Sequence, residues 1–376
     1  MRFLSCAGEL NHHGKFMCDS MYNILGLDFM RITTQDVNQE RLHLGYNKNE
    51  VAEYNKVQIN ADKNTVRETV KWCDIMDFGA APEIYLREAV RQNKIVFIRI
   101  ERLFKEGKWK IFIPTVIFRY YKKYIRYRNN PNVYFLCVSA YAAADLAKIG
   151  IKGDRVLQWA YCPEFVPMKE EQFESSDKTI NLLWCGRMIG WKHPEIAIKI
   201  ALELKKRGQE FHLKMLGNGE KFKEIQDLIH KYNLENEVEL CGGIESSKVR
   251  TYMKNADIFL ATSDQNEGWG VVINEAMNSG CVVFATPEMG AVPILIKNGI
   301  NGFYIEKHNE EETASKIIEL NRDRELLNSI KRKAYRTIKE HFSPDIYAKR
   351  FIEIGCNVLA GRKFEYDYLG AEAEIR

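Results

Sequence analysis

Two carboxylates in the segment from Ser263 to Gly280 have the type and spacing that suit the binding of a polyol such as a sugar. Glu267 stands directly before Gly268-Trp269-Gly270, and seven residues separate it from Glu275. Each carboxylate can accept hydrogen bonds from a pair of neighbouring hydroxyl groups. The alternative is a capping loop that carries two acidic surface residues.

The backbone around these glutamates is expected to bind an anion. A strand-like apolar run, Asp257–Ala261, precedes the segment, and a helical pattern, Val271–Ser279, follows it. The glycines on either side of Trp269 let the backbone approach a ligand closely. Free N–H groups where the helix starts, at Val271 and Val272, favour a negative charge. This agreement of strand, glycines and helix favours a binding loop.

A second group of residues carries positive charge. Arg187 and Lys192 lie between a strand-like run, Ile180–Cys185, and a helix that begins at Pro194. A guanidinium binds phosphate oxygens through two N–H groups, and an ammonium adds a point charge. The two residues are therefore candidates for binding a phosphate, and two solvated side chains are the alternative. His193 is interpreted as structural.

Two glycine-containing turns follow the next strands. Leu216-Gly217-Asn218-Gly219 lacks the third glycine of a dinucleotide-binding fingerprint, so it indicates a tight turn near a nucleotide. Gly242-Gly243-Ile244 closes the following strand, where backbone groups could contact a flat base.

The elements that must position these residues form two series in which strands alternate with helices. Such alternation implies right-handed crossovers and parallel sheets. The first series has strand-like runs at Arg2–Ala7, Asp28–Thr33, Asp74–Phe78, Ile95–Ile100, Val133–Ser139 and Val156–Ala160. The sequence predicts two doubly wound α/β domains, with ligands beyond the carboxyl ends of the strands and in a cleft between the domains.

The composition excludes several other classes of protein. A length of 376 residues fits two domains. An apolar share of 45% and a charged share of 28% exclude disorder, a collagen-like fibre and a small disulfide scaffold. The net charge of +4 is too weak to indicate a nucleic-acid partner.

The cysteines and the apolar runs indicate the compartment. Nine cysteines are scattered without any Cys-x-x-Cys spacing, so we interpret them as reduced core residues. The sequence shows neither a signal peptide nor a run of about 18 apolar residues. A cytoplasmic protein is expected, with peripheral contact at the inner face of the plasma membrane as a further possibility.

The motifs in this order resemble those of retaining glycosyltransferases of family 4. The resemblance is strong over residues 180 to 305 and includes Gly290-Ala291-Val292-Pro293 and Asn298-Gly299-Ile300-Asn301-Gly302. The first domain resembles the family in layout. There, Ile100–Phe104 and Val138–Tyr141 are similar to segments of bacterial capsule or exopolysaccharide transferases.

The resemblance implies the GT-B architecture and a transfer that retains the anomeric configuration of the donor. Arg187 and Lys192 would hold the donor diphosphate, Glu275 the ribose hydroxyls, and Glu267 hydroxyls of the donor sugar. The backbone of Gly268–Val272 would lie beside them, with Gly217 and Ile244 near the nucleotide. The acceptor would be a hydroxyl of a glycan or of a lipid-linked acceptor in the biosynthesis of a surface polysaccharide.

The alternation of strands and helices and a polar, strandless stretch predict the domain boundaries, and the resemblance adds a C-terminal helix that crosses back. Residues 1–162 would form the acceptor domain, 163–178 a polar linker, and 179–342 the domain for the nucleotide sugar. Residues 343–376 would form a helix that crosses back to the first domain, followed by a tail.

The sequence departs from the family pattern at three points. Trp269 stands where a smaller aromatic residue is usual, and Cys281 replaces a common proline. The histidine often found in the first domain is not evident around Asp77-Phe78-Gly79.

No Asp-x-Asp motif occurs in the chain, so we expect neither a metal nor another cofactor. Arg187, Lys192 and the start of the helix at Val271 could stabilise a leaving diphosphate in place of a metal ion.

The first domain offers further candidates. His12, His13 and Lys15 follow the first strand and could contact the acceptor or the donor phosphate, and Glu101 and Arg102 end another strand. Residues Phe118–Arg128 interleave basic and aromatic side chains, which could contact an anionic membrane surface. The alternative is a solvated amphipathic helix whose aromatic side chains pack on the sheet.

Two other functions compete with sugar transfer. A sugar-nucleotide epimerase could use the same fold, but the sequence offers no clear cluster of acid and base groups. A non-catalytic nucleotide-sugar-binding protein would not need Arg187, Lys192, Glu267 and Glu275 together.

Overall fold

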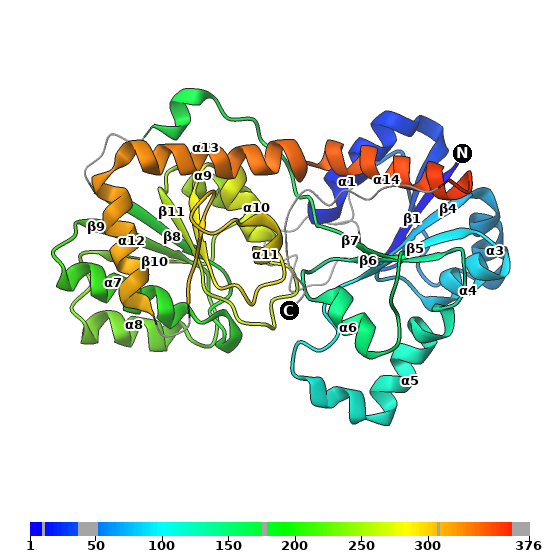
Figure 1. Cartoon of the computed structure of the whole chain (residues 1–376), viewed down its shortest axis with the longest axis horizontal. Coiled ribbons are helices and arrows are strands. Elements are labelled where there is room, and N and C mark those ends of the chain that lie inside the picture. The colour runs from blue at the N-terminus through cyan, green and yellow to red at the C-terminus, as the bar shows by residue number, and fades with distance from the viewer. Residues whose placement is uncertain (10–11, 37–51, 175–178, 307–308, 363–376) are drawn as a thin grey trace. The chain divides into compact units, whose positions relative to one another are not determined.

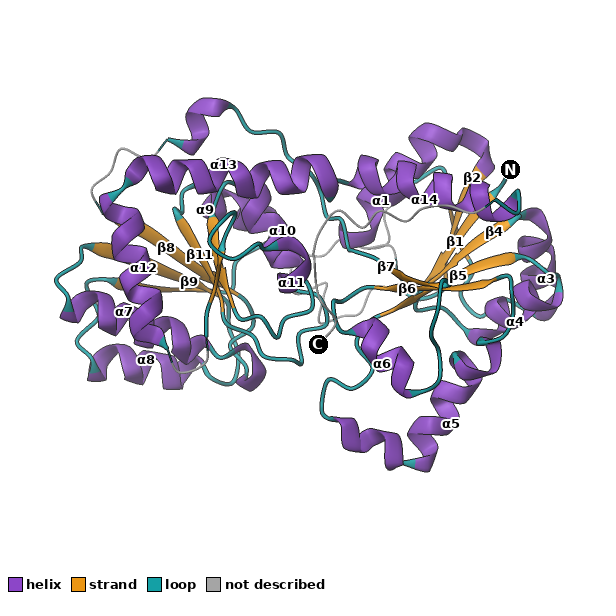
Figure 2. Cartoon of the chain, in the orientation of Figure 1, coloured by secondary structure: helices purple, strands orange, loops and turns teal. Residues whose placement is uncertain are grey.

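The computed structural model describes residues 1–9, 12–36, 52–174, 179–306 and 309–362. The chain divides into two compact units (Figure 1). Unit 1 contains Met1–Glu164 and, from the described part of the C-terminal segment, residues 343–362, and unit 2 contains Phe165–Phe342. Each unit has one parallel sheet between helices (Figure 2), which confirms the two doubly wound α/β domains predicted from the sequence.

The sheet of unit 1 has seven parallel strands in the order β3-β2-β1-β4-β5-β6-β7. Its central strands are buried on both faces, which explains their nearly continuous apolar sequences. The strands are β1 Phe3–Ala7, β2 Phe29–Thr33, β3 Asn55–Val57, β4 Ile75–Phe78, β5 Ile95–Ile100, β6 Val133–Cys137 and β7 Val156–Gln158.

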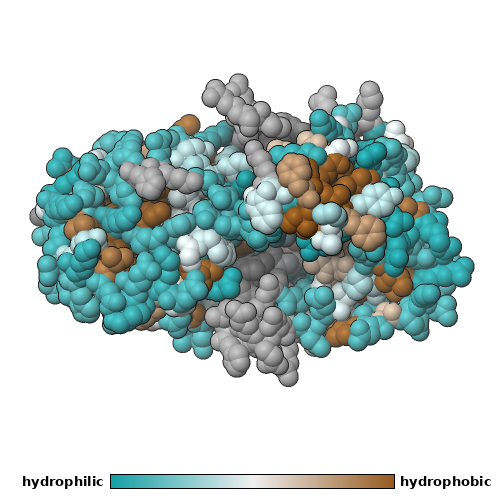
Figure 3. All heavy atoms as spheres, turned by 90° about the horizontal axis from the view of Figure 1, so that it is seen from below, coloured by the Kyte–Doolittle hydropathy of each residue, from teal (hydrophilic) through white to brown (hydrophobic). Residues whose placement is uncertain are grey.

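The helices of unit 1 are α1 His12–Leu25, α3 Lys63–Trp72, α4 Glu83–Arg91, α5 Pro114–Lys123, α6 Ala142–Lys148 and α14 Pro344–Leu359. Short 3-10 helices add η1 Gly26–Asp28, η2 Lys108–Phe112 and η3 Ile125–Tyr127. Neither β3 nor α3 was expected from the sequence. Figure 3 views the molecule from the side on which α5 lies and shows apolar side chains gathered on this unit.

The C-terminal helix α14 is an integral part of unit 1. Its Phe351 ring lies 5.7 Å from the ring of Phe3 and 5.1 Å from that of Phe97. A Cβ atom at Gly355 would come within 2.8 Å of Phe3, so the helix approaches β1 as closely as glycine permits. Helix α14 therefore completes the core of the unit that contains the N-terminus.

The sheet of unit 2 has six parallel strands in the order β10-β9-β8-β11-β12-β13. The strands are β8 Ile180–Cys185, β9 Phe211–Leu216, β10 Val238–Gly242, β11 Ile258–Ala261, β12 Val282–Ala285 and β13 Phe303–Tyr304. The helices are α7 Pro194–Lys206, α8 Phe222–Lys231, α9 Ser246–Lys254, α10 Val271–Asn278, α11 Val292–Leu295, α12 Glu310–Arg322 and α13 Arg324–His341.

The segment expected as a linker, residues 163–178, is mostly packed on unit 2. The Val166 backbone N–H donates to Asn278 Oδ1 (2.8 Å), and the Met168 N–H donates to the Tyr335 hydroxyl (3.1 Å). Phe173 is buried. The polar sequence of this segment did not indicate these contacts. Two of them are made by backbone N–H groups, and the third by the single side chain of Phe173. Residues 175–178 lie outside the described part of the chain.

Within the described residues, none of the helices has the length and apolar character that crossing a lipid bilayer requires.

Candidate functional site

The candidate residues of unit 2 follow β8 and β11, which are neighbours in the sheet although three helices and two strands separate them in sequence. The strand order reverses direction at this pair. Loops that leave such neighbouring strands diverge and open a crevice at the carboxyl edge, which is where doubly wound sheets bind ligands. Arg187 and Lys192 lie on the loop after β8, and Glu267 lies on the loop after β11.

Lys192 and Glu267 form a direct ion pair, the ammonium of Lys192 donating to Glu267 Oε2. The two side chains are only 17% and 15% exposed, and the ammonium also lies 4.7 Å from the centre of the Trp191 ring. From the sequence, Lys192 was expected to bind a phosphate and Glu267 a sugar, without contact between the two side chains. An ammonium has three N–H donors, so Lys192 can hold a phosphate oxygen and Glu267 at the same time.

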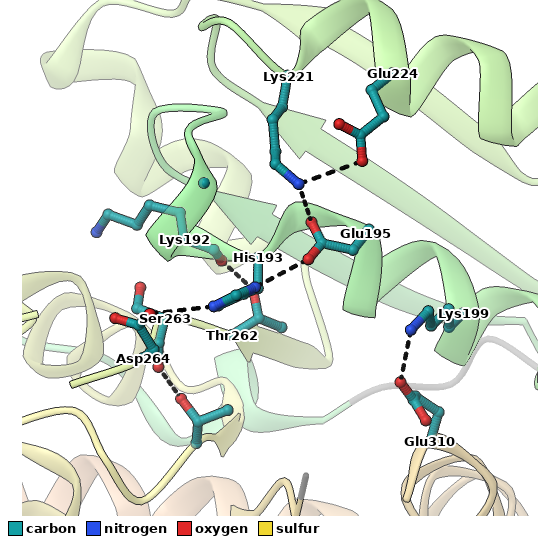
Figure 4. A network of polar contacts seen from close by, with 12 residues as sticks. Lys192, His193, Glu195, Lys199, Lys221, Glu224, Thr262, Ser263, Asp264 and Glu310 are labelled. Carbon is teal, nitrogen blue, oxygen red and sulfur yellow. Dashed lines mark hydrogen bonds and ion pairs between the residues drawn. The ribbon is translucent and has the colours of Figure 1, made fainter. Parts of the chain in front are cut away.

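A polar scaffold holds the two loops together (Figure 4). Thr262 accepts from the indole N–H of Trp184 (2.9 Å) and donates to the Lys192 carbonyl (2.7 Å). The Asp264 N–H donates to the Trp191 carbonyl (3.0 Å). The backbone that carries Lys192 is therefore tied directly to the loop that carries Glu267.

His193 adds a side-chain contact between these two loops, and its backbone has an unusual conformation. Its φ is +46°, in the left-handed region that costs a side chain about 1–2 kcal/mol. Its Nδ1 lies 2.9 Å from Glu195 and its Nε2 lies 3.3 Å from Asp264 (Figure 4). Two carboxylate contacts offset the cost of the conformation, so the structural role expected for His193 includes joining α7 to the second loop.

We expect the His193→Gly variant to keep nearly the wild-type melting temperature but to lose about tenfold in kcat/KM for the reaction proposed below. Glycine accepts the left-handed backbone without strain, while the contact with Asp264 is lost. His193→Ala should lose stability as well. The control is His230→Ala, because exposed His230 pairs with Glu235 far from this loop. Wild-type kcat/KM in His193→Gly would limit His193 to a backbone role.

Glycines bring the turn after β9 against the loop after β8. Gly217 has a φ of +134°, and a Cβ there would lie 1.8 Å from the Gly186 carbonyl oxygen. The Met188 N–H donates to the Asn218 carbonyl (2.8 Å), and the Gly217 N–H donates to the Gly242 carbonyl (2.7 Å). Backbone hydrogen bonds thus connect the turn after β9 to the loop after β8 and to the end of β10. Half-buried Ile244 follows β10.

In the loop before α10, the large side chain of Trp269 is buried, so the backbone of the loop is the part that a ligand could contact. Trp269 is 2% exposed, and its indole N–H donates to Asn274 Oδ1 (2.9 Å). Gly270, with a φ of +93°, precedes α10 and makes no side-chain cap. Trp269 therefore contributes packing and backbone to the site. Val271 and Val272 form the uncapped first turn, the anion-favouring feature predicted from the sequence.

Glu275 lies one turn further along α10 and is half-buried. Its charge acts on the thiol of Cys185 at the end of β8. Burial, together with the Glu275 carboxylate, raises the pKa of this thiol to about 12, and Lys192 opposes the increase. Glu275, Cys185 and Lys192 therefore share one electrostatic environment. Arg187, on the same loop as Lys192, is exposed.

The candidates of unit 1 are engaged in contacts of that unit. Lys15 pairs with Asp19 (2.6 Å), and Glu101 accepts from the hydroxyl of Tyr161 (3.0 Å) and pairs with Lys105 (2.9 Å). The Arg102 guanidinium lies over the Tyr141 ring at 4.5 Å. The side chains of His12 and His13 lie outside the described part of the structure.

Unit 1 also contains a largely buried cluster of charged side chains that was not expected from the sequence. Arg99 binds Asp77 through two hydrogen bonds of 2.7 and 2.6 Å, and Ser5 donates to the same carboxylate (3.2 Å). Arg31 donates to the carbonyl of Glu9 (2.8 Å), the last described residue of the loop after β1. Charged residues inside apolar strand sequences, as in Met30-Arg31-Ile32, were the available signal.

Among the described residues, no three His, Cys, Asp or Glu side chains gather in a way that could hold a metal ion.

Comparison with protein families matches residues 167–337 to the model described as "Glycosyl transferases group 1". The matched region coincides closely with unit 2 and contains Arg187, Lys192, Glu267 and Glu275. Unit 2 is therefore similar throughout to the glycosyl transferase group 1 domain.

Curated relatives match over part of their length. A protein of Salmonella typhimurium described as a colanic acid biosynthesis glycosyltransferase, WcaL, is 28% identical over 170 residues, which is 44% of this chain and 42% of the relative. The GPI3 subunit of a Saccharomyces cerevisiae phosphatidylinositol N-acetylglucosaminyltransferase is 25% identical over 49% of this chain and 40% of the relative. In both, the match spans less than half of the relative.

Solved structures match nearly the whole chain. A glycosyltransferase from Rickettsia africae has a TM-score of 0.67 at 18% identity and covers 95% of this chain and 98% of its own. Anabaena Alr3699/HepE, solved in complex with UDP and glucose, has a TM-score of 0.66 at 16% identity, covering 94% and 99%. The chain thus has the GT-B fold of these glycosyltransferases, as the sequence analysis expected.

Proposed function

We propose that this protein transfers a sugar from a nucleoside-diphosphate sugar to a hydroxyl of a glycan or lipid-linked acceptor, with retention of the anomeric configuration. The observation that carries the proposal is the Lys192–Glu267 pair beside the uncapped start of α10, at the point where the strand order of unit 2 reverses. This arrangement offers positive charge to a diphosphate and a carboxylate to sugar hydroxyls within one small site. The match of residues 167–337 to group 1 glycosyl transferases supports it.

The proposed reaction exchanges one C–O bond for another. The bond between the anomeric carbon and the diphosphate oxygen breaks, and the acceptor oxygen bonds to the same carbon. The acceptor proton moves to the leaving phosphate oxygen, so no protein base is required. Lys192, Arg187 and the N-terminus of α10 stabilise the charge that develops on the diphosphate.

The remaining side chains orient the donor. Glu275 is proposed to accept from the ribose hydroxyls, and Glu267 from hydroxyls of the transferred sugar. Glu267 is held by Lys192 before any ligand binds, so its position is set in advance and less entropy is lost on binding.

The acceptor class rests on the names of the relatives. One is named for colanic acid biosynthesis, and another for transfer of N-acetylglucosamine to phosphatidylinositol. The first name supports a glycan of a surface polysaccharide as acceptor, and the second supports a lipid-linked acceptor.

A panel of sugar nucleotides, each incubated with the protein and candidate acceptors, tests the proposal. The expected result is release of a nucleoside diphosphate together with a glycoside whose anomeric proton coupling matches that of the donor. An inverted product would contradict retention. An altered sugar nucleotide without a glycoside would identify an epimerase, and binding without any turnover would identify a sensor.

We further propose that the transfer needs no metal ion. Because Lys192, Arg187 and the start of α10 supply fixed positive charge, kcat should stay within about twofold of the untreated value in excess chelator. Loss of activity on chelation that magnesium or manganese restores would show that a metal ion shares this task.

A further inference from the structure

The crossover between β5 and β6 in unit 1 concentrates the positive charge of the chain. Residues 107–128 contain seven Lys or Arg and no Asp or Glu. The other 354 residues hold 48 basic and 51 acidic residues, a formal charge of −3. The net positive charge of the whole protein therefore comes from this one segment, and it is not spread over the surface.

The same segment contains the exposed aromatic side chains. Among the described residues, the large aromatic side chains classed as exposed are Trp109 at 58%, Phe112 at 84%, Phe118 at 58% and Tyr121 at 51%. Scattered exposed apolar residues are ordinary, but four aromatic ones within 13 residues are a patch. We call these four residues the aromatic patch.

Helix α5 has one face that is buried in unit 1 and an opposite, exposed face that carries part of the aromatic patch. Tyr120 and Tyr124 are buried, and the Tyr120 hydroxyl donates to the Leu103 carbonyl (2.8 Å), so this face is anchored to the core. Phe118, Tyr121 and Lys122 lie at the i, i+3 and i+4 positions of the opposite face. The buried tyrosines Tyr120, Tyr124 and Tyr127 therefore agree with the alternative given for Phe118–Arg128, while Phe118 and Tyr121 remain available for contact with a surface.

Trp109 and Phe112 extend the exposed face beyond the helix into η2. The indole N–H of Trp109 donates to the Glu106 carbonyl (3.2 Å), and the ring lies so close to Gly107 that a Cβ there would meet it at 2.7 Å. The indole is therefore held in place on the surface. Figure 3 shows apolar side chains gathered on this side of unit 1, with hydrophilic side chains around them.

We infer that η2 and α5 form a docking surface for an anionic lipid bilayer. The aromatic patch would enter the interface between headgroups and acyl chains, while Arg119, Lys122 and Arg126, all exposed, contact lipid phosphates. Lys122 lies 4.3 Å from the Phe118 ring, so charge and apolar surface occupy the same site. A short helix with exposed Phe on one face suits a bilayer interface better than the solvated groove of a nucleic acid.

This inference deepens the proposed function and in one respect rests on it, since a lipid-linked acceptor would be present at the surface to which the protein docks. Binding to vesicles requires neither donor nor acceptor. A failure of docking is therefore distinguishable from a failure of sugar transfer.

The test is co-sedimentation of the full-length protein with phosphatidylcholine vesicles, with or without about one third phosphatidylglycerol. We expect binding only to the anionic vesicles, and weaker binding as salt is added. The double variant Phe112→Ser and Phe118→Ser should bind the anionic vesicles at least about tenfold more weakly, because neither serine can insert an apolar ring into the bilayer interface. Lys122→Gln with Arg126→Gln should weaken binding to a similar extent.

Matched controls use equally exposed residues elsewhere. Leu27→Ser, at a residue 83% exposed in the same unit, should leave vesicle binding unchanged. Lys71→Gln with Lys223→Gln removes two charges whose side chains are 71% and 75% exposed and should also have little effect. Equal binding to neutral vesicles, wild-type binding by the Phe112 and Phe118 double variant, or binding of an RNA oligonucleotide in place of vesicles would each overturn the inference.

Discussion

Replacing Lys192 with alanine should lower kcat for sugar transfer about 100- to 1,000-fold, the usual effect of removing one group that stabilises charge in a transition state. Lys192 is the most enclosed positive charge of the candidate site, so its interaction with a leaving diphosphate is weakly screened by water. Arg187→Ala should act in the same direction. The measurement is steady-state release of nucleoside diphosphate at saturating donor.

The ion pair with Glu267 requires a second variant for interpretation. Lys192→Ala leaves the Glu267 carboxylate without its partner, which by itself could disturb the loop. The double variant Lys192→Ala and Glu267→Gln removes that charge and should not recover activity. Lys199→Ala is the control, because Lys199 pairs with Glu310 at the start of α12 (3.5 Å), apart from the Lys192 contacts (Figure 4). Retention of more than about a third of wild-type kcat in Lys192→Ala would refute the phosphate role.

Gly217→Ala should abolish donor binding and lower the free energy of unfolding of unit 2 by about 3 kcal/mol. Two causes add together. The backbone φ of +134° strains any side chain, and the new methyl group would lie 1.8 Å from the Gly186 carbonyl oxygen. Relief of that clash moves the loop that carries Arg187. Calorimetric melting and titration with donor measure the two effects.

Gly208→Ala provides a control matched in backbone conformation but not in contact. Its φ is +69°, and nothing lies within 4 Å of the position its Cβ would occupy. The variant should lose about 1 kcal/mol of stability from strain alone and should bind donor normally. If Gly217→Ala resembled Gly208→Ala in both measurements, the close approach of the two turns would have no role in the site.

The order and type of most elements followed from the sequence, because they depend on local patterns. In unit 2, β8 was predicted with the bounds observed, since a buried parallel strand has an apolar run that ends at glycine or polar residues. β3 has three half-buried or exposed residues and no such run, so it was missed together with α3. The glycines near Trp269 and the spacing of Glu267 and Glu275 were also visible, since a loop that joins a strand to a helix is continuous in sequence.

The sequence by itself determined which residue types stand at the ends of which strands, and therefore which chemistry they could perform. Only the tertiary structure decided which of them meet. Lys192 and Glu267 are 75 residues apart, and their ion pair depends on β8 and β11 being neighbours in the sheet. The burial of Trp269 and the exposure of Phe112 are likewise set by what packs beside them. Local patterns report the backbone conformation of a segment, whereas contacts between distant segments depend on the free energy of the whole packed unit.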